Sequence, residues 1–404
     1  QDMGDCFQLL HFHQGSQITN IRHIKAALNE AARVYVELVK QGAGLKFLDV
    51  GGGLGVDYDG SQTNFESSVN YSLQEYANDV VYHVQSVCDD AGVDHPTIMS
   101  ESGRAVVAYH SMLVFSVLGV SEQASHEPIN QPSHNVQQPV QDLFETLEGL
   151  NVRNLLESYH DAQQSLDTAM NLFASGYLPL DQRAIIEQVY WSICQRISKL
   201  AKQLEYVPEE IEAISPGLCD TYFCNFSLFQ SIPDSWAIKQ LFPLMPIHRL
   251  DERPDCSAVL GDVTCDSDGK IEQFIDRRDV KRSLPLHSLK NEPYYLGAFL
   301  VGAYQEILGD LHNLFGDTHD VHISSDEHGR VVVDTVVKGD TVSQVLQYVE
   351  FNPDELAKNL RCSIEEAIGN GLISDGQAGR FIRFYEDGLG GYTYLEESTV
   401  SESS

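Results

Sequence analysis

Apolar residues near the N-terminus fall into three short runs that are separated by two long stretches of helical spacing. The runs Leu9–His13, Lys46–Val50 and Thr97–Ser100 predict strands, and the stretches 21–40 and 73–91 predict helices with one apolar face. This β-α-β-α-β order predicts a parallel sheet. Polar residues or glycines follow all three strands, which suits part of a β/α barrel, where functional sites lie at that end of the strands.

The pattern changes after residue 120. Ser121–Gln141 is rich in Ser, His, Asn, Gln and Pro, which predicts a linker or an exposed loop. Helical spacing then covers Leu143–Met170 and Asp181–Leu204, with Pro179 and Pro208 as breakers. We therefore expect an inserted helical hairpin or small bundle.

From Thr221 onward the chain has β character, and it ends in helices. The candidate strands are Ala258–Thr264, Gly269–Ile275, Tyr294–Val301, His319–Ser324 and Gly329–Val337. A turn at Asp326–Gly329 joins the last two. Helices are predicted at about 303–315, 341–349, 353–370 and 374–388, before an acidic tail.

These patterns predict an α/β and β fold with four regions. They are part of a β/α barrel over 1–120, a linker and helical insertion over 121–220, a β domain over 221–340, and a C-terminal helical segment and tail over 341–404. The run Cys6–His13 reads like an interior strand at the very start of the chain. We therefore expect the chain to begin inside a domain.

Charge and cysteine usage narrow the range of partners. The 404 residues include 26 Lys and Arg against 59 Asp and Glu, a formal net charge of −33. Such a field repels phosphate backbones, which argues against nucleic-acid binding. It either helps to gather a cationic substrate or reflects a solvated surface. Eight scattered cysteines without a CxxC pair favour reduced thiols and a cytoplasmic location, and no apolar run approaches the ~20 residues that span a membrane.

A glycine cluster directly follows the second predicted strand. Gly51, Gly52 and Gly53 let successive backbone N–H groups turn toward one point, which predicts an anion cradle. A dinucleotide fingerprint needs Gly or Ala at the sixth position from Gly51, and Val56 stands there. A tight turn without a ligand remains the alternative.

Two further motifs stand at the ends of the first and third strands. His11 and His13 share a face and suit either a metal or a structural pair, and the Gly-Ser that follows them suits a phosphate. Glu101 and Arg104 flank a glycine and, taken alone, make no more than a surface ion pair.

A last motif holds a thiol between acids. Asp266, Asp268 and Gly269 form a turn or a fragment of a calcium loop, although the later ligand positions of such a loop are not filled. Cys265 lies beside these carboxylates, an environment that suits proton donation better than metal binding.

Taken together and in this order, the motifs resemble the fold-type III pyridoxal-phosphate decarboxylases, and among them the bacterial biosynthetic arginine decarboxylase family. The segments that resemble this family are His11–Gln17, Phe47–Asp59, Glu101–Arg104, Asn225–Asp234, Thr264–Gly269 and Gly302–Gly316. Asn225–Asp234 and the helical insertion before it are not expected in the ornithine or diaminopimelate branches. The resemblance implies that residues 1–120 are the C-terminal part of an alanine-racemase-like, pyridoxal-phosphate-binding (β/α)8 barrel.

The resemblance also implies a role for each motif. His13 would lie against the pyridine ring, and Glu101 would pair with the ring nitrogen, which helps the ring to accept electrons. Cys265 would return a proton to the substrate α-carbon and Asp266 would meet the distal cation of the substrate, both at the cofactor of the partner subunit. The phosphate would be held by Ser16, Gly51, Gly52, Gly53, Arg104 and Tyr304. Substrate and cofactor contacts are expected along Leu48, Asp49, Val50, Gly51, Gly52, Gly53, Leu54, Gly55, Val56, Asp57 and Tyr58.

The implied reaction is the conversion of L-arginine to agmatine and CO2, the first step toward putrescine and spermidine, in a homodimer or higher oligomer with Mg²⁺. The rivals are decarboxylation of ornithine, lysine or diaminopimelate, and a non-catalytic regulatory homologue. Lys25, Lys40 and Lys46 do not stand in the motif of the lysine that binds the cofactor. We therefore expect an N-terminally truncated fragment that is unstable and inactive by itself.

Overall fold

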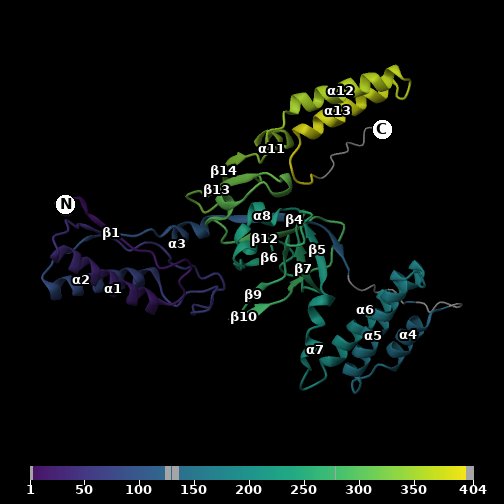
Figure 1. Cartoon of the computed structure of the whole chain (residues 1–404), viewed down its shortest axis with the longest axis horizontal. Coiled ribbons are helices and arrows are strands. Elements are labelled where there is room, and N and C mark those ends of the chain that lie inside the picture. Colours follow the sequence, from purple (N-terminus) through teal and green to yellow (C-terminus); the bar gives the residue numbers. More distant parts are fainter. Residues whose placement is uncertain (1–2, 123–128, 130–135, 278, 397–404) are drawn as a thin grey trace.

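The structure, a computed structural model, describes residues 3–122, 129, 136–277 and 279–396. Figure 1 shows an N-terminal unit of strands and helices beside a central sheet, a bundle of long helices that projects from the sheet, and a C-terminal group of a hairpin and helices on another side. The polar motifs of the sequence lie mainly in the N-terminal unit and in the loops of the central sheet.

The N-terminal unit is a parallel sheet with two covering helices, as predicted. Strands β1 (Leu9–His11), β2 (Phe47–Asp49) and β3 (Thr97–Met99) pair in this order, and helices α1 (Ile21–Lys40) and α2 (Leu73–Ala91) pack together. Both helices have the predicted bounds.

Local signals explain these helix bounds, and burial explains the packing. The side chains of Asn20 and Ser72 accept hydrogen bonds from the first turns of α1 and α2. Leu48 of β2 is buried among apolar residues of both helices. The first predicted strand is shorter than expected and not buried: Leu9 is 39% exposed, because β1 pairs only with β2 among the described strands.

The central sheet begins earlier in the chain than the sequence indicated. Residues 112–120 were assigned to the barrel region, but Met112–Ser121 forms strand β4, which pairs with β5 (Asp220–Cys224) and β12 (Tyr294–Phe299). The apolar run of β4 is nearly continuous, without the alternation that marks a strand half exposed to water. The region boundary placed at residue 120 is therefore wrong by the length of this strand.

The rest of the sheet comes from short strands of the β region. The order is β11-β7-β5-β4-β12-β6, with β8 beside β7. Its remaining members are β6 (Leu244–Pro246), β7 (Cys256–Gly261), β8 (Lys270–Ile271) and β11 (Leu284–Leu286), and β9 (Phe274–Asp276) pairs separately with β10 (Asp279–Lys281). The predicted strand at Gly269–Ile275 is thus two short strands in two different sheets.

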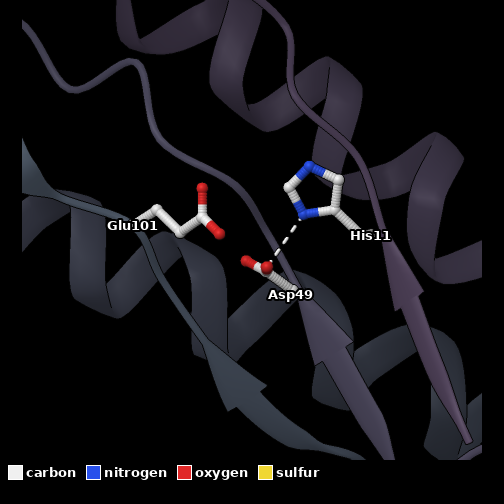
Figure 2. A group of neighbouring side chains, drawn as sticks. All are labelled: His11, Asp49 and Glu101. Atoms are coloured by element: carbon white, nitrogen blue, oxygen red, sulfur yellow. Dashed lines mark hydrogen bonds and ion pairs between the residues drawn. The ribbon is translucent and has the colours of Figure 1, made fainter.

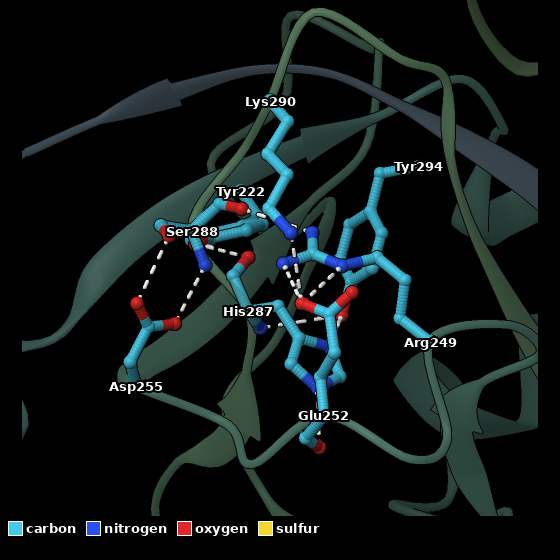
Figure 3. A network of polar contacts seen from close by, with 8 residues as sticks. All are labelled: Tyr222, Arg249, Glu252, Asp255, His287, Ser288, Lys290 and Tyr294. Atoms are coloured by element: carbon cyan, nitrogen blue, oxygen red, sulfur yellow. Dashed lines mark hydrogen bonds and ion pairs between the residues drawn. The ribbon is translucent and has the colours of Figure 1, made fainter.

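A polar network fixes the loop between β6 and β7 to the loop between β11 and β12 (Figure 3). The carboxylate of Glu252 accepts hydrogen bonds from Arg249 and Lys290, which lowers the pKa of Glu252 to about 2. Beneath it, the ring of His287 contacts the Tyr294 hydroxyl at 2.8 Å. This corner of the sheet is held by charge and hydrogen bonds more than by apolar contact.

The predicted helical insertion is a bundle with its own apolar core. Helices α4 (Gln138–Gly149), α5 (Leu155–Ala174) and α6 (Leu180–Ala201) bury a separate cluster of aliphatic side chains, followed by the short α7 (Glu209–Glu212). The single helical stretch expected at Leu143–Met170 is wrong: it is divided between α4 and α5. Asn154 marks the division, since its side chain accepts from the Asn151 N–H and donates to the Gly149 carbonyl.

The predicted linker at Ser121–Gln141 is only partly described. Residues 123–128 and 130–135 lie outside the described residues, and Gln138–Gln141 is already the first turn of α4. A proline near the start of a helix costs no hydrogen bond, which explains how Pro139 begins α4.

The C-terminal region contains the predicted hairpin and helices. Strands β13 (Asp320–Ser325) and β14 (Val331–Val337) form a two-stranded sheet of their own. Helices α11 (Val342–Tyr348), α12 (Pro353–Gly369) and α13 (Asp375–Gly390) follow. Capping boxes at Thr341 and Ser374 start α11 and α13 at the predicted places. The predicted tail from 397 onward lies outside the described residues.

The helix predicted at about 303–315 is wrong. Only α10 (Gln305–Leu308) and a short 3-10 turn at His312–Leu314 are helical. Tyr304, Asn313 and Leu314 all have positive φ angles, which a continuous α-helix does not allow. This segment is a folded loop that positions Tyr304.

Candidate active site

The ends of the three parallel strands meet at a small cavity of about 120 Å³. The strands run in register, with His11, Asp49 and Met99 side by side, so the residues that follow each strand converge. The cavity is lined by His13, Gly15, Ser16, Gly52, Gly53, Leu54, Glu101, Ser102, Arg104 and Tyr304. Eight of them were assigned to the site from the sequence, and they come from segments far apart in the chain.

The glycine turn after β2 leaves no room for side chains. Gly51 and Gly53 have φ angles of 67° and 91°, in the left-handed region that favours glycine. A Cβ at Gly51 would meet the carbonyl oxygen of Phe12, and a Cβ at Gly53 would meet that of Gly15. Close backbone packing is therefore one reason why glycines stand in this turn.

The three glycines are not equivalent. The N–H of Gly51 donates to the Asp49 carboxylate at 2.9 Å, and Gly51 is not among the residues that line the cavity. The N–H of Gly52 donates to Nδ1 of His13 at 3.2 Å. The structure thus places Gly52 and Gly53 at the cavity and gives Gly51 a supporting position, which differs from the expected contact of all three with a phosphate.

Arg104 is a buried cation beside the cavity. It is 6% exposed, and its guanidinium donates to the Tyr58 hydroxyl at 2.8 Å and to Oγ of Ser16 at 3.2 Å. Burial raises the pKa of Tyr58 despite the opposing charge of Arg104, so this hydroxyl stays neutral. Within the described residues, no carboxylate forms an ion pair with Arg104. A buried guanidinium without an acid is strongly suited to an anionic ligand.

Tyr304 reaches the cavity from the central sheet. Its ring centre lies 5.0 Å from the Arg104 guanidinium carbon, and its backbone has a φ angle of 71°. Two buried residues hold this loop: Gln305 donates to the Asp234 carboxylate at 2.8 Å and accepts from the Asp234 N–H at 3.1 Å. This pairing connects two segments that the sequence singled out, Asn225–Asp234 and Gly302–Gly316.

Beside the cavity, three titratable side chains meet (Figure 2). Nδ1 of His11 lies 2.8 Å from Oδ2 of Asp49, and Glu101 points toward the same carboxylate. Burial by itself raises the pKa of Asp49, but hydrogen bonds from the Gly51 N–H and the His11 ring bring the pKa below its ordinary value. Asp49 is therefore a fixed negative charge next to Glu101.

This cluster changes the interpretation of the two histidines. Potential ligand atoms of His11, Asp49 and Glu101 lie within 4.8 Å of one another, so the third metal ligand that the sequence did not reveal is present for His11. His13 points elsewhere and contacts Gly52. The sequence missed this arrangement, because the strand register that aligns His11 with Asp49 is not visible in it.

The predicted substrate segment is mostly core. Gly52, Gly53 and Leu54 line the cavity, whereas Leu48, Val50 and Val56 are buried in apolar clusters, where their side chains cannot touch a substrate. Ser102 also lines the cavity but had no predicted role, and Gly15 was expected there only as part of the Gly-Ser pair after His13.

Cys265 and Asp266 do not reach this cavity. Both are exposed on the loop between β7 and β8, where Nε2 of His312 lies 3.7 Å from Asp266. The buried carboxylate of Asp262 shapes the loop by accepting hydrogen bonds from the N–H groups of Leu228 and Thr264. The structure therefore brings neither Cys265 nor Asp266 to the cavity of its own chain.

Fold and cavity agree with the class of pyridoxal-dependent decarboxylases. The family model of the pyridoxal binding domain of these enzymes matches residues 6–108, the segment that contains the glycine turn, Glu101 and Arg104. Two further models match, the arginine decarboxylase helical bundle domain at 133–215 and the arginine decarboxylase C-terminal helical extension at 342–395.

Individual relatives indicate which group of pyridoxal-dependent decarboxylases the chain is similar to. The biosynthetic arginine decarboxylase of Rhodopirellula baltica is 54% identical over 98% of this chain, and that of Bacteroides thetaiotaomicron is 50% identical over 97%. The crystal structure of the biosynthetic arginine decarboxylase from Campylobacter jejuni matches 98% of this chain with a TM-score of 0.81 at 34% identity. The chain belongs to the biosynthetic arginine decarboxylase family. It spans 64% of the Rhodopirellula and Campylobacter proteins and 62% of the Bacteroides protein.

None of the described helices combines the length and the apolar character that crossing a bilayer requires.

Proposed function

We propose that this chain forms part of a pyridoxal-phosphate-dependent decarboxylase that converts L-arginine to agmatine and CO2, toward putrescine and spermidine. The observation that supports the proposal most directly is the buried guanidinium of Arg104. It lies beside the glycine turn and lacks an acidic partner among the described residues. A phosphate group would supply the missing negative charge. The match to the pyridoxal binding domain supports the phosphate of pyridoxal phosphate as this group.

The residues around the cavity fit the phosphate end of the cofactor. Arg104 and Ser16 offer charged and hydroxyl donors, and the turn at Gly52–Gly53 brings backbone close to the same point. Tyr304 closes the cavity from the other side. When bound, the cofactor supplies a pyridine ring that accepts the electron pair left by the departing CO2.

Glu101 and His13 are proposed to act on that ring. Glu101 lies at the cavity with the negative charge of Asp49 behind it, an arrangement that favours a cation, such as a protonated ring nitrogen, in front of it. His13 is held by the Gly52 N–H at 3.2 Å, which leaves its ring face free to lie against the cofactor.

Cys265 and Asp266 are proposed to complete the site of a partner subunit. Their exposure on one loop allows both to enter a second copy of the cavity. There Cys265 would give a proton to the α-carbon after CO2 leaves, and Asp266 would pair with the guanidinium of arginine. Such a shared site requires a homodimer or a higher oligomer. The cytoplasmic location also remains a prediction.

Magnesium does not suit the one group of three potential metal ligands in the described part of the chain. Mg²⁺ prefers oxygen ligands in octahedral geometry. The group formed by His11, Asp49 and Glu101 contains an imidazole, which suits transition metals better, and Glu101 is already assigned to the cofactor. We therefore assign no magnesium ligand among the residues that the structure describes.

The test measures CO2 release by the protein expressed from its complete coding sequence, with arginine, ornithine, lysine and diaminopimelate in competition. We expect arginine to be consumed preferentially, and we expect Cys265→Ala to lower kcat by about 10²- to 10⁴-fold, the usual contribution of a positioned proton donor. Cys362→Ala, an exposed thiol on α12, is the matched control and should leave kcat unchanged. Preferential use of ornithine, or no turnover of any substrate by the wild-type protein, would contradict the proposal.

A further inference from the structure

His312 lies against the loop that contains Cys265 and Asp266, and one of its ring nitrogens has nothing to bond with. Nε2 of His312 is buried and lacks a hydrogen-bond partner among the described residues. Oδ2 of Asp266 lies 3.7 Å from it, which is longer than a hydrogen bond by less than about 1 Å. Buried polar atoms are normally paired, so a small movement of the loop would satisfy this nitrogen.

Backbone and aromatic packing both fix the position of His312. The next two residues, Asn313 and Leu314, have φ angles of 54° and 62°, a region that residues other than glycine seldom adopt. The ring centre of His312 lies 4.2 Å from that of Phe229, a buried residue of helix α8 (Leu228–Ser231). An unfavourable backbone conformation persists only where the surrounding structure determines it, so the fold itself places this imidazole.

A second aromatic contact reaches the same loop from Phe229. Its ring packs edge-to-face on Trp236 of helix α9 (Pro233–Ala237), with ring centres 5.4 Å apart. The indole N–H of Trp236 donates to Oδ2 of Asp268 at 3.3 Å. The three rings therefore connect Asp266 and Asp268, two carboxylates of the loop between β7 and β8.

The carboxylate of Asp266 faces a different donor with each oxygen. Oδ1 accepts a hydrogen bond of 3.0 Å from the N–H of Asp268, and Oδ2 faces Nε2 of His312. A carboxylate accepts about four hydrogen bonds, so two donors from its own chain fix its plane and leave two acceptor positions for a ligand. Those two positions match the paired N–H groups of a guanidinium.

We propose that His312 is a positioning residue for the distal cation of the substrate. Its Nε2–H hydrogen-bonds to Oδ2 of Asp266 and orients the carboxylate that pairs with the guanidinium. This inference rests on the proposed function, which gives Asp266 its role. His312 does not touch the substrate, and its effect passes through Asp266. Orienting an exposed side chain in advance lowers the entropy that is lost when the ligand binds.

Steady-state kinetics with arginine, on the protein expressed from its complete coding sequence, test this role. His312→Phe keeps an aromatic ring against Phe229 but removes the donor, and it should raise KM by about tenfold while lowering kcat by less than about threefold. His312→Gln keeps an N–H donor and should recover most of the affinity. The matched control is His322→Phe, which removes an exposed histidine 2.9 Å from Asp320 on β13, and it should change either constant by less than about twofold.

A double-mutant cycle shows whether the effect passes through Asp266. Asp266→Asn should raise KM by itself, because the charge that attracts the guanidinium is lost. Adding His312→Phe to Asp266→Asn should raise KM by less than about twofold more, since there is no longer a carboxylate to orient. Calorimetric titration with agmatine, which carries the same guanidinium, should rank the affinities of these variants in the same order.

Additive effects of the two substitutions would overturn the inference, and so would a His312→Phe variant whose kcat falls while its KM is unchanged. The second result would mean that His312 only stabilises the loop, because a loosened loop would misplace Cys265 and slow the transfer of the proton. Wild-type kinetics in His312→Phe would also overturn the inference and would leave the proposed decarboxylation intact. A wild-type protein that does not consume arginine would instead contradict the proposed function, and this inference with it.

Discussion

Nη1 of Arg104 donates a hydrogen bond of 2.8 Å to the hydroxyl of Tyr58, and both side chains are buried. The bond joins the short helix α3 (Gly103–Val107), which follows β3, to the segment that follows β2, so the guanidinium is fixed before any ligand arrives. Tyr58 in turn packs edge-to-face on Phe242 of the β region, with ring centres 5.7 Å apart. The proposed phosphate clamp is therefore anchored in the core of the molecule.

Replacing Arg104 should weaken the binding of pyridoxal phosphate selectively. Hydrogen bonds to charged groups contribute about 1.5–3 kcal/mol, so Arg104→Ala should raise the Kd by about 10- to 100-fold. Arg104→Lys keeps the charge but loses the forked geometry of the guanidinium, so its Kd should lie between that of the wild type and that of Arg104→Ala. Fluorescence titration of the protein expressed from its complete coding sequence measures the Kd.

Pyridoxal without the phosphate is the internal control for this prediction, and its affinity should change by less than about twofold in the same variants. Arg33→Ala, on the exposed face of α1, controls for the loss of a positive charge. Equal losses for both ligands would show that Arg104 does not contact the phosphate.

The N-terminal fold was predictable because its signals are local. The apolar face and the caps of α1 and α2 are contained in the segments themselves, and the sequence predicted both helices at their observed bounds. β4 was not predictable in the same way, because its partners β5 and β12 lie about 100 and 175 residues further along the chain. An apolar run without alternation does not reveal which sheet it joins.

The site was predictable only as far as resemblance extends. The resemblance implied that Glu101 and Arg104 share a site with the glycine turn, and the structure brings Glu101, Arg104, Gly52 and Gly53 to one cavity. The exchange of hydrogen bonds between Asp49, Gly51 and His11 depends on strand register, and so it appears only in three dimensions. The sequence likewise does not show which residues of Leu48–Tyr58 are buried in the core and which line the cavity.

Asp49 should make the stability of the protein depend on pH in the acid range. Its pKa is lowered in the folded state from 3.8, so its ionised form stabilises the fold above that pH, and the contribution is lost as the pH falls through the folded pKa. Asp49→Asn should therefore lower the free energy of unfolding by about 1–3 kcal/mol at pH 7, the typical effect of losing hydrogen bonds to a buried charge. Urea unfolding at pH 7, 5 and 3.5 measures it.

The deficit of Asp49→Asn relative to wild type should begin to shrink as the pH falls below 3.8 and should continue to shrink down to the lower pKa of the folded state, where the wild-type carboxyl also becomes neutral. Asp90→Asn, an exposed position near the end of α2, is the control and should show little difference at any of these pH values. A deficit of the same size at every pH would mean that the Asp49 charge does not contribute to stability.

The glycine turn offers a test that separates backbone strain from close packing. Gly51 and Gly60 have similar φ angles, 67° and 71°, but a Cβ at Gly51 would meet the carbonyl of Phe12, whereas a Cβ at Gly60 meets no atom within 4 Å. Gly60→Ala should therefore cost only the left-handed conformation, about 1–2 kcal/mol. Gly51→Ala should cost this amount plus the displacement of the β1 end, about 1–3 kcal/mol more.

Urea denaturation of both variants measures the two costs, and the affinity for pyridoxal phosphate shows whether the extra cost falls on the site. The Gly51 N–H contacts Asp49 and not the cavity, so a shift of this turn should reach the cofactor through Gly52 and Glu101. We therefore expect Gly51→Ala to weaken cofactor binding and Gly60→Ala to leave it unchanged. Equal destabilisation by Gly51→Ala and Gly60→Ala would show that the turn tolerates a side chain at Gly51. It would contradict the inference that the Phe12 carbonyl leaves no room there.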